Sequence, residues 1–240
     1  MTMTPIAPHI TAFLQQRLPV ERNASDHTCD SYAYAFKLLF EYASDCLKVP
    51  PSALHLEQLD APLVVAFLNH LETTRGNGPS SRNTRLAAIK SFMHFMSYRV
   101  PSAMEQIQRI LAIPAKKAET RLVKHLTSEE MQSILDAPVP NHRDGIRDRA
   151  MLHLCFAAGL RVSELIGLRL DDLKLQPHAS ILIHGKGRKE RCLPLWKETA
   201  AALRAWLAMR GTVFAPELFV NARGEAMTRS GFEYILRKHA

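Results

Sequence analysis

Two short segments of the chain contain residues whose types and spacing suit the binding of a phosphate group. Arg161 and Glu164 lie in the run GLRVSEL at 159–165, and Lys186 lies in the run HGKGRKERCLPL at 184–195. The planar fork of an arginine can grip a phosphate with two parallel hydrogen bonds, whereas a lysine offers a compact cation that can also release a proton. Together the two segments predict a site for a phosphate ester.

The first segment predicts a tight corner between two helices. An apolar helix expected over 146–158 ends at Gly159, a residue suited to the left-handed turn that closes a helix. The next helix is expected to begin near Val162, which places Arg161 on the corner. Glu164 follows three residues later, so that its carboxylate shares a face with Arg161 and can orient the guanidinium group.

The second segment predicts a β-hairpin. Short β-branched runs at 180–184 and 191–195 flank a turn at Gly185-Lys-Gly187, which places Lys186 at the hairpin tip. Taken alone, an arginine after a capping glycine is an ordinary surface residue, and a basic tip is an ordinary soluble hairpin. The order and spacing of both segments favour a common site.

The run GLRVSELIGLRLDDL followed by ILIHGKGRKERCLPL closely resembles the first half of the catalytic domain of bacterial tyrosine-type site-specific DNA recombinases, the phage integrase family. The resemblance implies that Arg161 is the first catalytic arginine, Glu164 its acidic helper and Lys186 the lysine that protonates the leaving oxygen. It also implies DNA recombination and integration through a phosphotyrosine intermediate, which retains the phosphodiester energy and needs no metal ion or other cofactor.

Composition and charge favour a polyanionic partner. The 240 residues can form one large domain or two modest ones, and they carry a formal net charge of +8. The four cysteines form no C-x-x-C pair, which predicts reduced thiols in a cytoplasmic protein. No secretory signal or membrane-spanning run is found in the sequence, so that no membrane partner is expected.

The first part of the chain predicts a helical domain over 1–113. Helices are expected over 9–18, 27–48, 63–74 and about 81–98, with apolar residues recurring at helical spacing. This four-helix pattern and the run SSRNTRLAAIKSFMHFM resemble the SAM-like core-binding domain with which the recombinase family clamps DNA.

The fourth of these helices lies in a segment that is basic throughout. Between Thr73 and Met104 the sequence has no acidic residue. Such a face could follow backbone phosphates, although an ordinary basic surface helix accounts for the segment equally well. The resemblance favours double-stranded DNA, and the phosphate contacts expected on this ground are Arg82, Arg85, Lys90 and Lys116.

Residues 114–124 combine proline, charge and low periodicity, which predicts an interdomain linker before a catalytic domain over 125–240. That domain should begin with a capping box at 127–130 and, after the hairpin, contain a helix over 196–210, a short strand at 218–220 and a last helix capped by Thr228. Phe156, Trp196 and Trp206 are expected in its core. The whole chain is therefore expected to be mainly α-helical with a small antiparallel sheet.

The family pattern also requires a His-x-x-Arg pair and a nucleophilic tyrosine beyond this point. None of the 11 histidines has an arginine three positions downstream, and Tyr234 is the one tyrosine after Arg161. Tyr234 precedes the place where the histidine pair should come, which indicates a packing or surface role. We therefore expect a C-terminally truncated recombinase that binds DNA but does not cleave it alone, and whose assembly into the family's homo-oligomer on DNA is in doubt.

Three functions fit these observations. The first is a recombinase lineage, and the second is a catalytically dead module or regulator that occupies recombination sites. The third is a helix-turn-helix transcription regulator, which has no need of a lysine-bearing hairpin beside Arg161. Arg161→Ala separates the first two, because it should abolish strand rejoining in a chain of full length and leave most DNA affinity intact.

Overall fold

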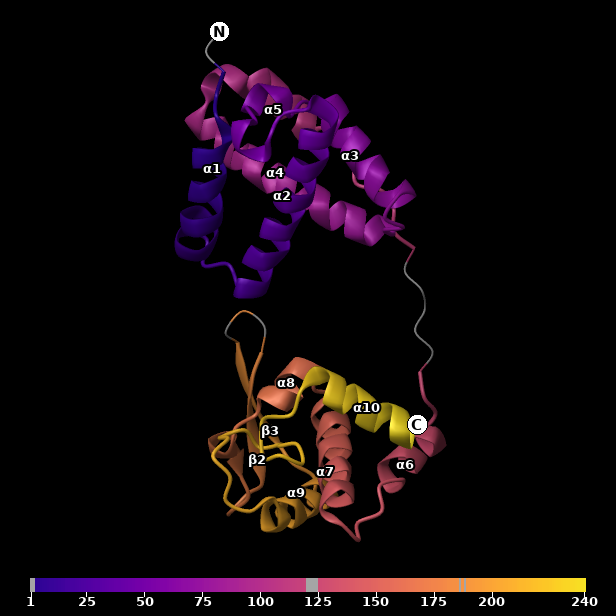
Figure 1. Ribbon diagram of the computed structural model, residues 1–240. Helices are drawn as coiled ribbons and strands as arrows, with labels where there is room; N and C mark the ends of the chain where they lie inside the picture. Colours follow the sequence, from indigo (N-terminus) through magenta and orange to yellow (C-terminus); the bar gives the residue numbers. More distant parts are fainter. Residues whose placement is uncertain (1–2, 120–124, 186, 188) are drawn as a thin grey trace. The chain divides into compact units, whose positions relative to one another are not determined.

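The computed structural model describes residues 3–119, 125–185, 187 and 189–240. The chain forms two compact units, Met1–Leu122 and Val123–Ala240 (Figure 1). The described residues are mainly helical, and a small antiparallel sheet lies in the second unit. This confirms the predicted fold class. Within the described residues, no helix is both long enough and apolar enough to cross a membrane.

The first unit is a bundle of helices joined by short loops. Its elements are α1 (Ile6–Ala12), η1 (Phe13–Glu21), α2 (Asp26–Leu47), η2 (Pro51–Ala53), η3 (Leu56–Gln58), α3 (Ala61–Thr73), α4 (Pro79–Arg99), η4 (Pro101–Ala103) and α5 (Met104–Leu111). The side chain of Asp60 accepts a hydrogen bond from the Leu63 amide at 2.8 Å and so caps α3 as predicted. Helix α5 was not predicted, because its eight residues offer only Ile107 and Ile110 as a buried face.

Aromatic rings hold the first unit together. The ring of Phe92 on α4 lies 5.3 Å, between centroids, from both Phe13 of η1 and Phe36 of α2, in edge-to-face geometry. All three side chains are buried. The basic helix α4 is therefore fixed against α2 by its apolar face, as its periodicity predicts.

The second unit places a hairpin against a layer of helices. Its elements are α6 (Ser128–Asp136), α7 (Arg143–Ala158), α8 (Val162–Gly167), η5 (Leu170–Asp172), β1 (Leu173–Lys174), β2 (Ser180–His184), β3 (Glu190–Pro194), α9 (Lys197–Arg210) and α10 (Arg229–His239). Thr127 and Glu130 form the predicted capping box, and Thr228 caps α10. The strand predicted at 218–220 is not formed. In its place, isolated β-bridges occur at Val220 and at the neighbouring residue Glu217.

The three strands lie in the order β1-β2-β3 in the sheet. Figure 1 labels β2 and β3, the two strands of the hairpin. Ile183 pairs with Arg191 and His184 with Glu190 across the hairpin. Ile181 and Ile183 are buried, so one face of β2 packs on the core of the unit. The predicted hairpin is confirmed, while Lys186 lies outside the described residues.

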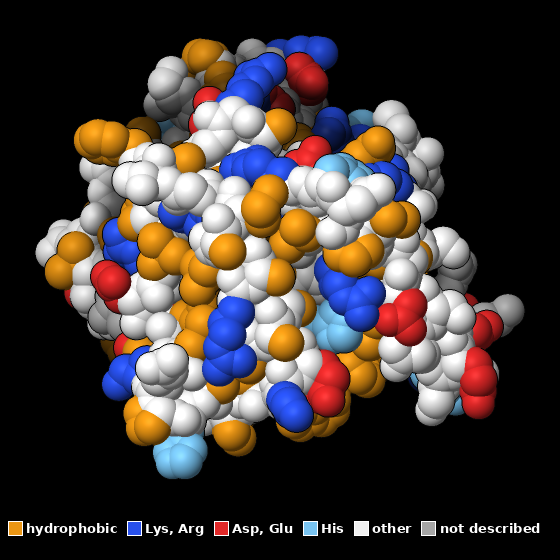
Figure 2. Space-filling model, turned by 90° about the horizontal axis from the view of Figure 1, so that it is seen from below, with side chains coloured by type: hydrophobic (Ala, Val, Ile, Leu, Met, Phe, Trp, Pro, Cys, Tyr) orange, Lys and Arg blue, Asp and Glu red, His pale blue; other side chains and the backbone are white. Residues whose placement is uncertain are grey.

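The core of the second unit differs from the prediction at two aromatic residues. Trp206 is fully buried and its Nε1 donates to the Leu218 carbonyl at 2.8 Å, as expected of a core tryptophan. Trp196 is 59% exposed and Phe156 is 46% exposed, so their predicted core positions are wrong. The two rings are in edge-to-face contact, with centroids 6.1 Å apart, and they line a groove bounded by α6, α7 and α9. Figure 2 looks onto the face that includes α9 and shows hydrophobic side chains gathered there among Lys and Arg.

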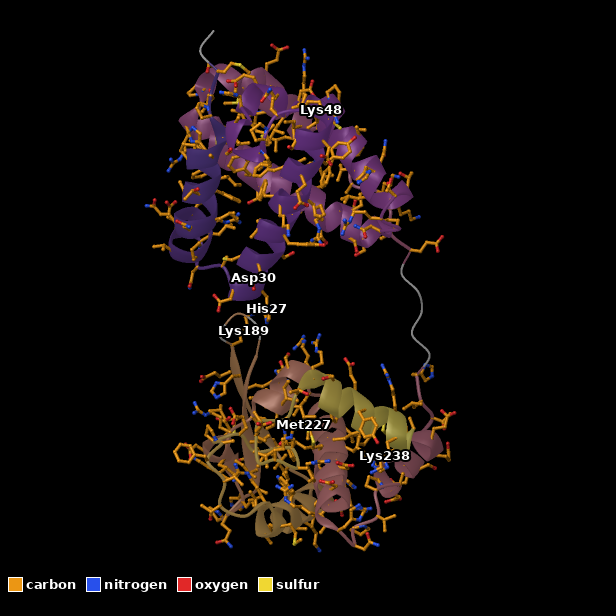
Figure 3. All side chains as sticks on the ribbon, in the orientation of Figure 1. His27, Asp30, Lys48, Lys189, Met227 and Lys238 are labelled. Atoms are coloured by element: carbon orange, nitrogen blue, oxygen red, sulfur yellow. The ribbon has the colours of Figure 1, made fainter. Side chains whose placement is uncertain are left out.

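A buried carboxylate attaches the last helix to α7. Asp148 is 1% exposed, and its Oδ2 lies 3.2 Å from His239 Nε2 and 3.7 Å from Lys238 Nζ, both on α10. Figure 3 labels Lys238 on this helix. Arg147 also contacts Asp148, at 2.7 Å, so the buried charge is paired. These contacts position α10 against the helix that leads into the corner at Gly159.

Candidate functional site

The corner at Arg161 is built as the sequence predicts. Gly159 has φ +55°, a left-handed conformation that side-chain-bearing residues rarely adopt, and it ends α7. Leu160 is buried and anchors the turn in the core. Arg161 then has extended backbone geometry as the N-cap of α8, which begins at Val162. The corner therefore presents Arg161 at the junction between two helices.

Glu164 holds Arg161 by two hydrogen bonds. Its Oε2 accepts from the backbone N–H of Arg161 at 3.0 Å, and its Oε1 accepts from Arg161 Nη1 at 3.0 Å. The Glu164 side chain is 4% exposed, whereas that of Arg161 is 69% exposed. The carboxylate is thus a buried support, and the guanidinium group is free to meet a ligand from solvent.

Arg191 of β3 is a third member of this cluster, which the sequence reasoning missed. Its Nη2 donates to Glu164 Oε2 at 2.9 Å and its Nη1 donates to Oε1 at 3.2 Å. The hydrogen bonds from Arg191, joined by those from Arg161, outweigh the effect of burial and lower the pKa of Glu164 to about 2. The basic run RKER at 188–191 indicated that cations lie near the hairpin. The strand register decides that Arg191 of this run contacts Glu164.

Two carboxylates fix the base of the hairpin through His184. Its Nδ1 lies 3.0 Å from Glu190 Oε1, and its Nε2 lies 3.0 Å from Asp172 Oδ1. The contact with Asp172, and then that with Glu190, raises the pKa of His184 above its usual value. The Gly185 N–H donates to the Lys189 carbonyl at 2.7 Å. The base of the hairpin is therefore held by side chains as well as by strand pairing, and Figure 3 labels Lys189 at the hairpin.

In the first unit, the predicted phosphate contact Arg82 is buried, with 4% of its surface exposed. Its Nη1 donates to the Pro114 carbonyl at 3.3 Å, and its Nε lies 3.7 Å from Glu72. A side chain enclosed in this way stabilises the unit and is not offered to DNA in this arrangement. The other predicted cations are more accessible, although Lys116 pairs with Glu72 at 2.7 Å and Arg85 lies 5.0 Å over the Tyr34 ring.

Lys90 lies in a groove that the sequence reasoning did not recognise. Arg22 reaches across it, where its Nη1 donates to Ser91 Oγ at 3.0 Å. Tyr98, at its border, is 85% exposed. The polar side chains that line this groove come from η1, α2, α4 and the loop after η1, and they are Arg17, Arg22, Tyr32, Lys90, Ser91, His94 and Tyr98. A cationic groove with exposed aromatic edges suits a nucleic-acid backbone.

The geometry around Arg161 is suited to stabilising charge on a phosphate. A guanidinium group held in place stabilises the extra negative charge of a pentacoordinate phosphorus, and removal of such a donor typically costs about 10²–10³ in rate. In the described part of the chain, no group of three or more His, Cys, Asp or Glu side chains could hold a metal ion.

Comparisons with known sequences identify the family. The model of the phage integrase family matches residues 124–240, and that of the phage integrase N-terminal SAM-like domain matches residues 10–99. The putative integrase/recombinase y4rC of Sinorhizobium fredii is 44% identical over 98% of this chain and 70% of its own length. A second protein of that organism, y4rD, is 40% identical over 97% and 84% of the two chains. The tyrosine recombinase XerC of Pelobacter propionicus is 34% identical over 99% and 76%.

Solved structures agree on the fold. The XerH site-specific recombinase bound to its palindromic difH substrate superposes with a TM-score of 0.68 at 22% identity, and this chain spans 64% of its length. A lambda integrase tetramer bound to a Holliday junction gives a TM-score of 0.67 at 15% identity, over 98% of this chain and 66% of that one. The chain thus belongs to the phage integrase family of tyrosine recombinases, as the resemblance of its motifs predicts.

Proposed function

We propose that this chain acts in site-specific DNA recombination, in which it binds double-stranded DNA and supplies the Arg161 part of the strand-cleaving site. The observation that carries the proposal is an exposed arginine held at a helix–helix corner by a buried carboxylate. A protein that only occupies recombination sites gains nothing from this arrangement, so we do not favour the binding-module alternative.

In this proposal Arg161 binds the non-bridging oxygens of the scissile phosphate, and Glu164 holds the guanidinium group in place. Lys186 keeps its predicted role as the proton donor to the leaving oxygen. The bond between Arg161 and Glu164 uses Nη1 of the guanidinium group. Since a guanidinium group has five N–H donors, donors remain for a phosphate.

The 240-residue chain is expected to bind DNA without cleaving it. Its sequence holds no His-x-x-Arg pair. Tyr234, the one tyrosine after Arg161, is 67% exposed on α10 and lies in the same helix as residues that attach α10 to α7. A surface role for Tyr234 fits this position.

The first unit would supply phosphate contacts along the duplex. We assign these contacts to Arg85, Lys90 and Lys116 of the original prediction, and we add Arg22 and His94 from the basic groove. Arg82 is assigned to the structure of the unit, because it is buried. Contacts of this kind release counterions from DNA, which makes the affinity fall steeply with salt.

The proposal is tested by titrating the 240-residue chain with duplex DNA at several salt concentrations and recording intact masses of the mixture. We expect binding that weakens as salt rises, with no covalent protein–DNA adduct. Arg161→Ala should leave most of this affinity intact, because the many phosphate contacts of the first unit remain. Failure to bind DNA would refute the binding role. A covalent adduct would refute the expectation that this chain binds DNA without cleaving it.

We further propose that several copies of the chain assemble on DNA, since the lambda integrase structure contains a tetramer on a Holliday junction. The masses of the same complexes under native conditions distinguish one bound copy from several.

A further inference from the structure

We propose that Arg191 is a positioning residue that keeps the charge of Arg161 available to a phosphate by acting as the counter-ion of Glu164. This inference rests on the proposed function of Arg161. It assigns to β3 a task in the site at the α7–α8 corner, although the two segments are about thirty residues apart in the sequence.

The hydrogen bonds show how one carboxylate is divided between two arginines. Arg191 donates from both Nη atoms, one to each oxygen of Glu164, at 3.2 and 2.9 Å. The Arg161 side chain donates from Nη1 alone, to Oε1. The remaining contact of Arg161 comes from its backbone N–H, which any residue at this position would provide. The stronger, forked grip on Glu164 therefore belongs to Arg191.

The local charge follows from this division. Glu164 is almost fully buried, and a buried carboxylate requires a cation nearby. With Arg191 present, two guanidinium groups share one carboxylate, and the cluster retains one positive charge. Without Arg191, Arg161 would be the one guanidinium partner of the carboxylate among the described residues, and the pair would be neutral. A neutral pair attracts a phosphate less than a cationic cluster does.

The hairpin is shaped to bring Arg191 to this place. A Cβ atom added at Gly185 would lie 3.2 Å from the Lys189 carbonyl oxygen, 3.3 Å from Arg191 Nη1 and 3.4 Å from Glu164 Oε1. Glycine therefore allows the end of β2 to approach the Glu164–Arg191 pair closely. Opposite Arg191, Ile183 is buried, which fixes the register of the hairpin at this position.

The test uses the 240-residue chain with ¹⁵N-labelled arginine and follows the side-chain NMR signal of Arg161. Inorganic phosphate is titrated against chloride at constant ionic strength. Arg191→Gln should weaken phosphate binding at Arg161 by about 5-fold. Glu164 would then neutralise the charge of Arg161, and the contribution of such a charge at a partly exposed site is modest. The matched control is Arg149→Gln, because Arg149 pairs with Asp136 at 3.2 Å and is 33% exposed, close to the 36% of Arg191.

A double variant separates the counter-ion role from a merely structural one. Glu164→Gln removes the charge that would neutralise Arg161, so the pair Glu164→Gln/Arg191→Gln should recover phosphate binding relative to Arg191→Gln alone. If Arg191 only joined β3 to α8, the second substitution would add further damage. Arg191→Lys keeps the charge without the fork and should fall between wild type and Arg191→Gln.

The outcomes distinguish this inference from the proposed function. If phosphate fails to shift the Arg161 signal of the wild type, the phosphate site and this inference both fail. If the wild type responds and Arg191→Gln binds phosphate equally well, this inference alone fails. Should Arg191→Gln lose its folded amide spectrum, Arg191→Lys and the double variant decide: no phosphate binding by a folded Arg191→Lys, which keeps the charge, or no binding by a folded double variant, would refute the counter-ion role.

Discussion

Two of the arginine–glutamate pairs in this protein, one in each unit, are exposed in opposite ways. In the first unit the Arg82 side chain is 5% exposed and that of Glu72 is 19% exposed. In the second unit the Arg161 side chain is 69% exposed, and that of Glu164 is 4% exposed. An ion pair with a buried cation stabilises its own unit, whereas one with a buried anion presents its cation to a ligand.

The partners of each pair explain the difference. Arg82 is enclosed because it also donates to the carbonyl of Pro114, which ties the segment after α5 to α4. The Glu164 side chain is 4% exposed and accepts hydrogen bonds from Arg161 of the corner and from Arg191 of β3, so its charge is already shared. Similar residue types therefore serve packing in one unit and, in our proposal, ligand binding in the other.

The largest effect is expected for Arg82→Ala, which should lower the free energy of unfolding by about 2–3 kcal/mol. The substitution removes a buried side chain with its partly buried hydrogen bond to Pro114, and it leaves Glu72 with Lys116 as its ion-pair partner. Urea unfolding measures the change. Arg109→Ala is the control, because Arg109 also pairs with a glutamate but is 71% exposed. If the stability is unchanged, Arg82 does not stabilise the unit, and it is again a candidate for contact with DNA.

The second effect concerns acid stability and should amount to about 2 kcal/mol, since two of the three groups in the cluster are partly exposed to solvent. The folded-state pKa of Glu164 is about 2, below the ordinary value of 4.5. Its contribution is therefore present above pH 4.5 and is lost as the pH falls towards 2. Urea unfolding of wild type and Glu164→Gln between pH 3 and 6 should converge on acidification, and a constant difference would contradict this.

A smaller effect is expected on DNA binding. Lys90→Ala should reduce the slope of log affinity against log salt by about 1, because one phosphate contact is lost. Lys37→Ala is the control, since Lys37 is exposed on α2 and lies beside Glu41. Equal slopes for wild type and Lys90→Ala would remove the basic groove from the interface.

The smallest effect is expected at His184. Its pKa is raised from 6.5, mainly by Asp172, so its protonated form holds the base of the hairpin below that pH and this support is lost as the pH rises through the raised pKa. An NMR titration of the His184 ring should give a lower pKa in Asp172→Asn than in wild type. Glu190→Asn should cause a smaller drop, and the reverse order would show that Asp172 is not the main partner.

The sequence alone determined the local features of the site. Gly159 ends one helix, Arg161 caps the next, and Glu164 lies three residues on; each follows from the geometry of a single turn. The hairpin and the helix caps are local in the same way. The resemblance of these motifs also identified the family before any tertiary contact was known.

Only the tertiary structure decided which charged and aromatic groups are exposed. The burial of Arg82, the exposure of Trp196 and the grip of Arg191 on Glu164 each depend on residues far away in the sequence. Helical or strand spacing shows which residues share a face, but it does not show which face packs against another element. For this reason the sequence located the arginine of the site, and the fold revealed the second arginine that leaves its charge free.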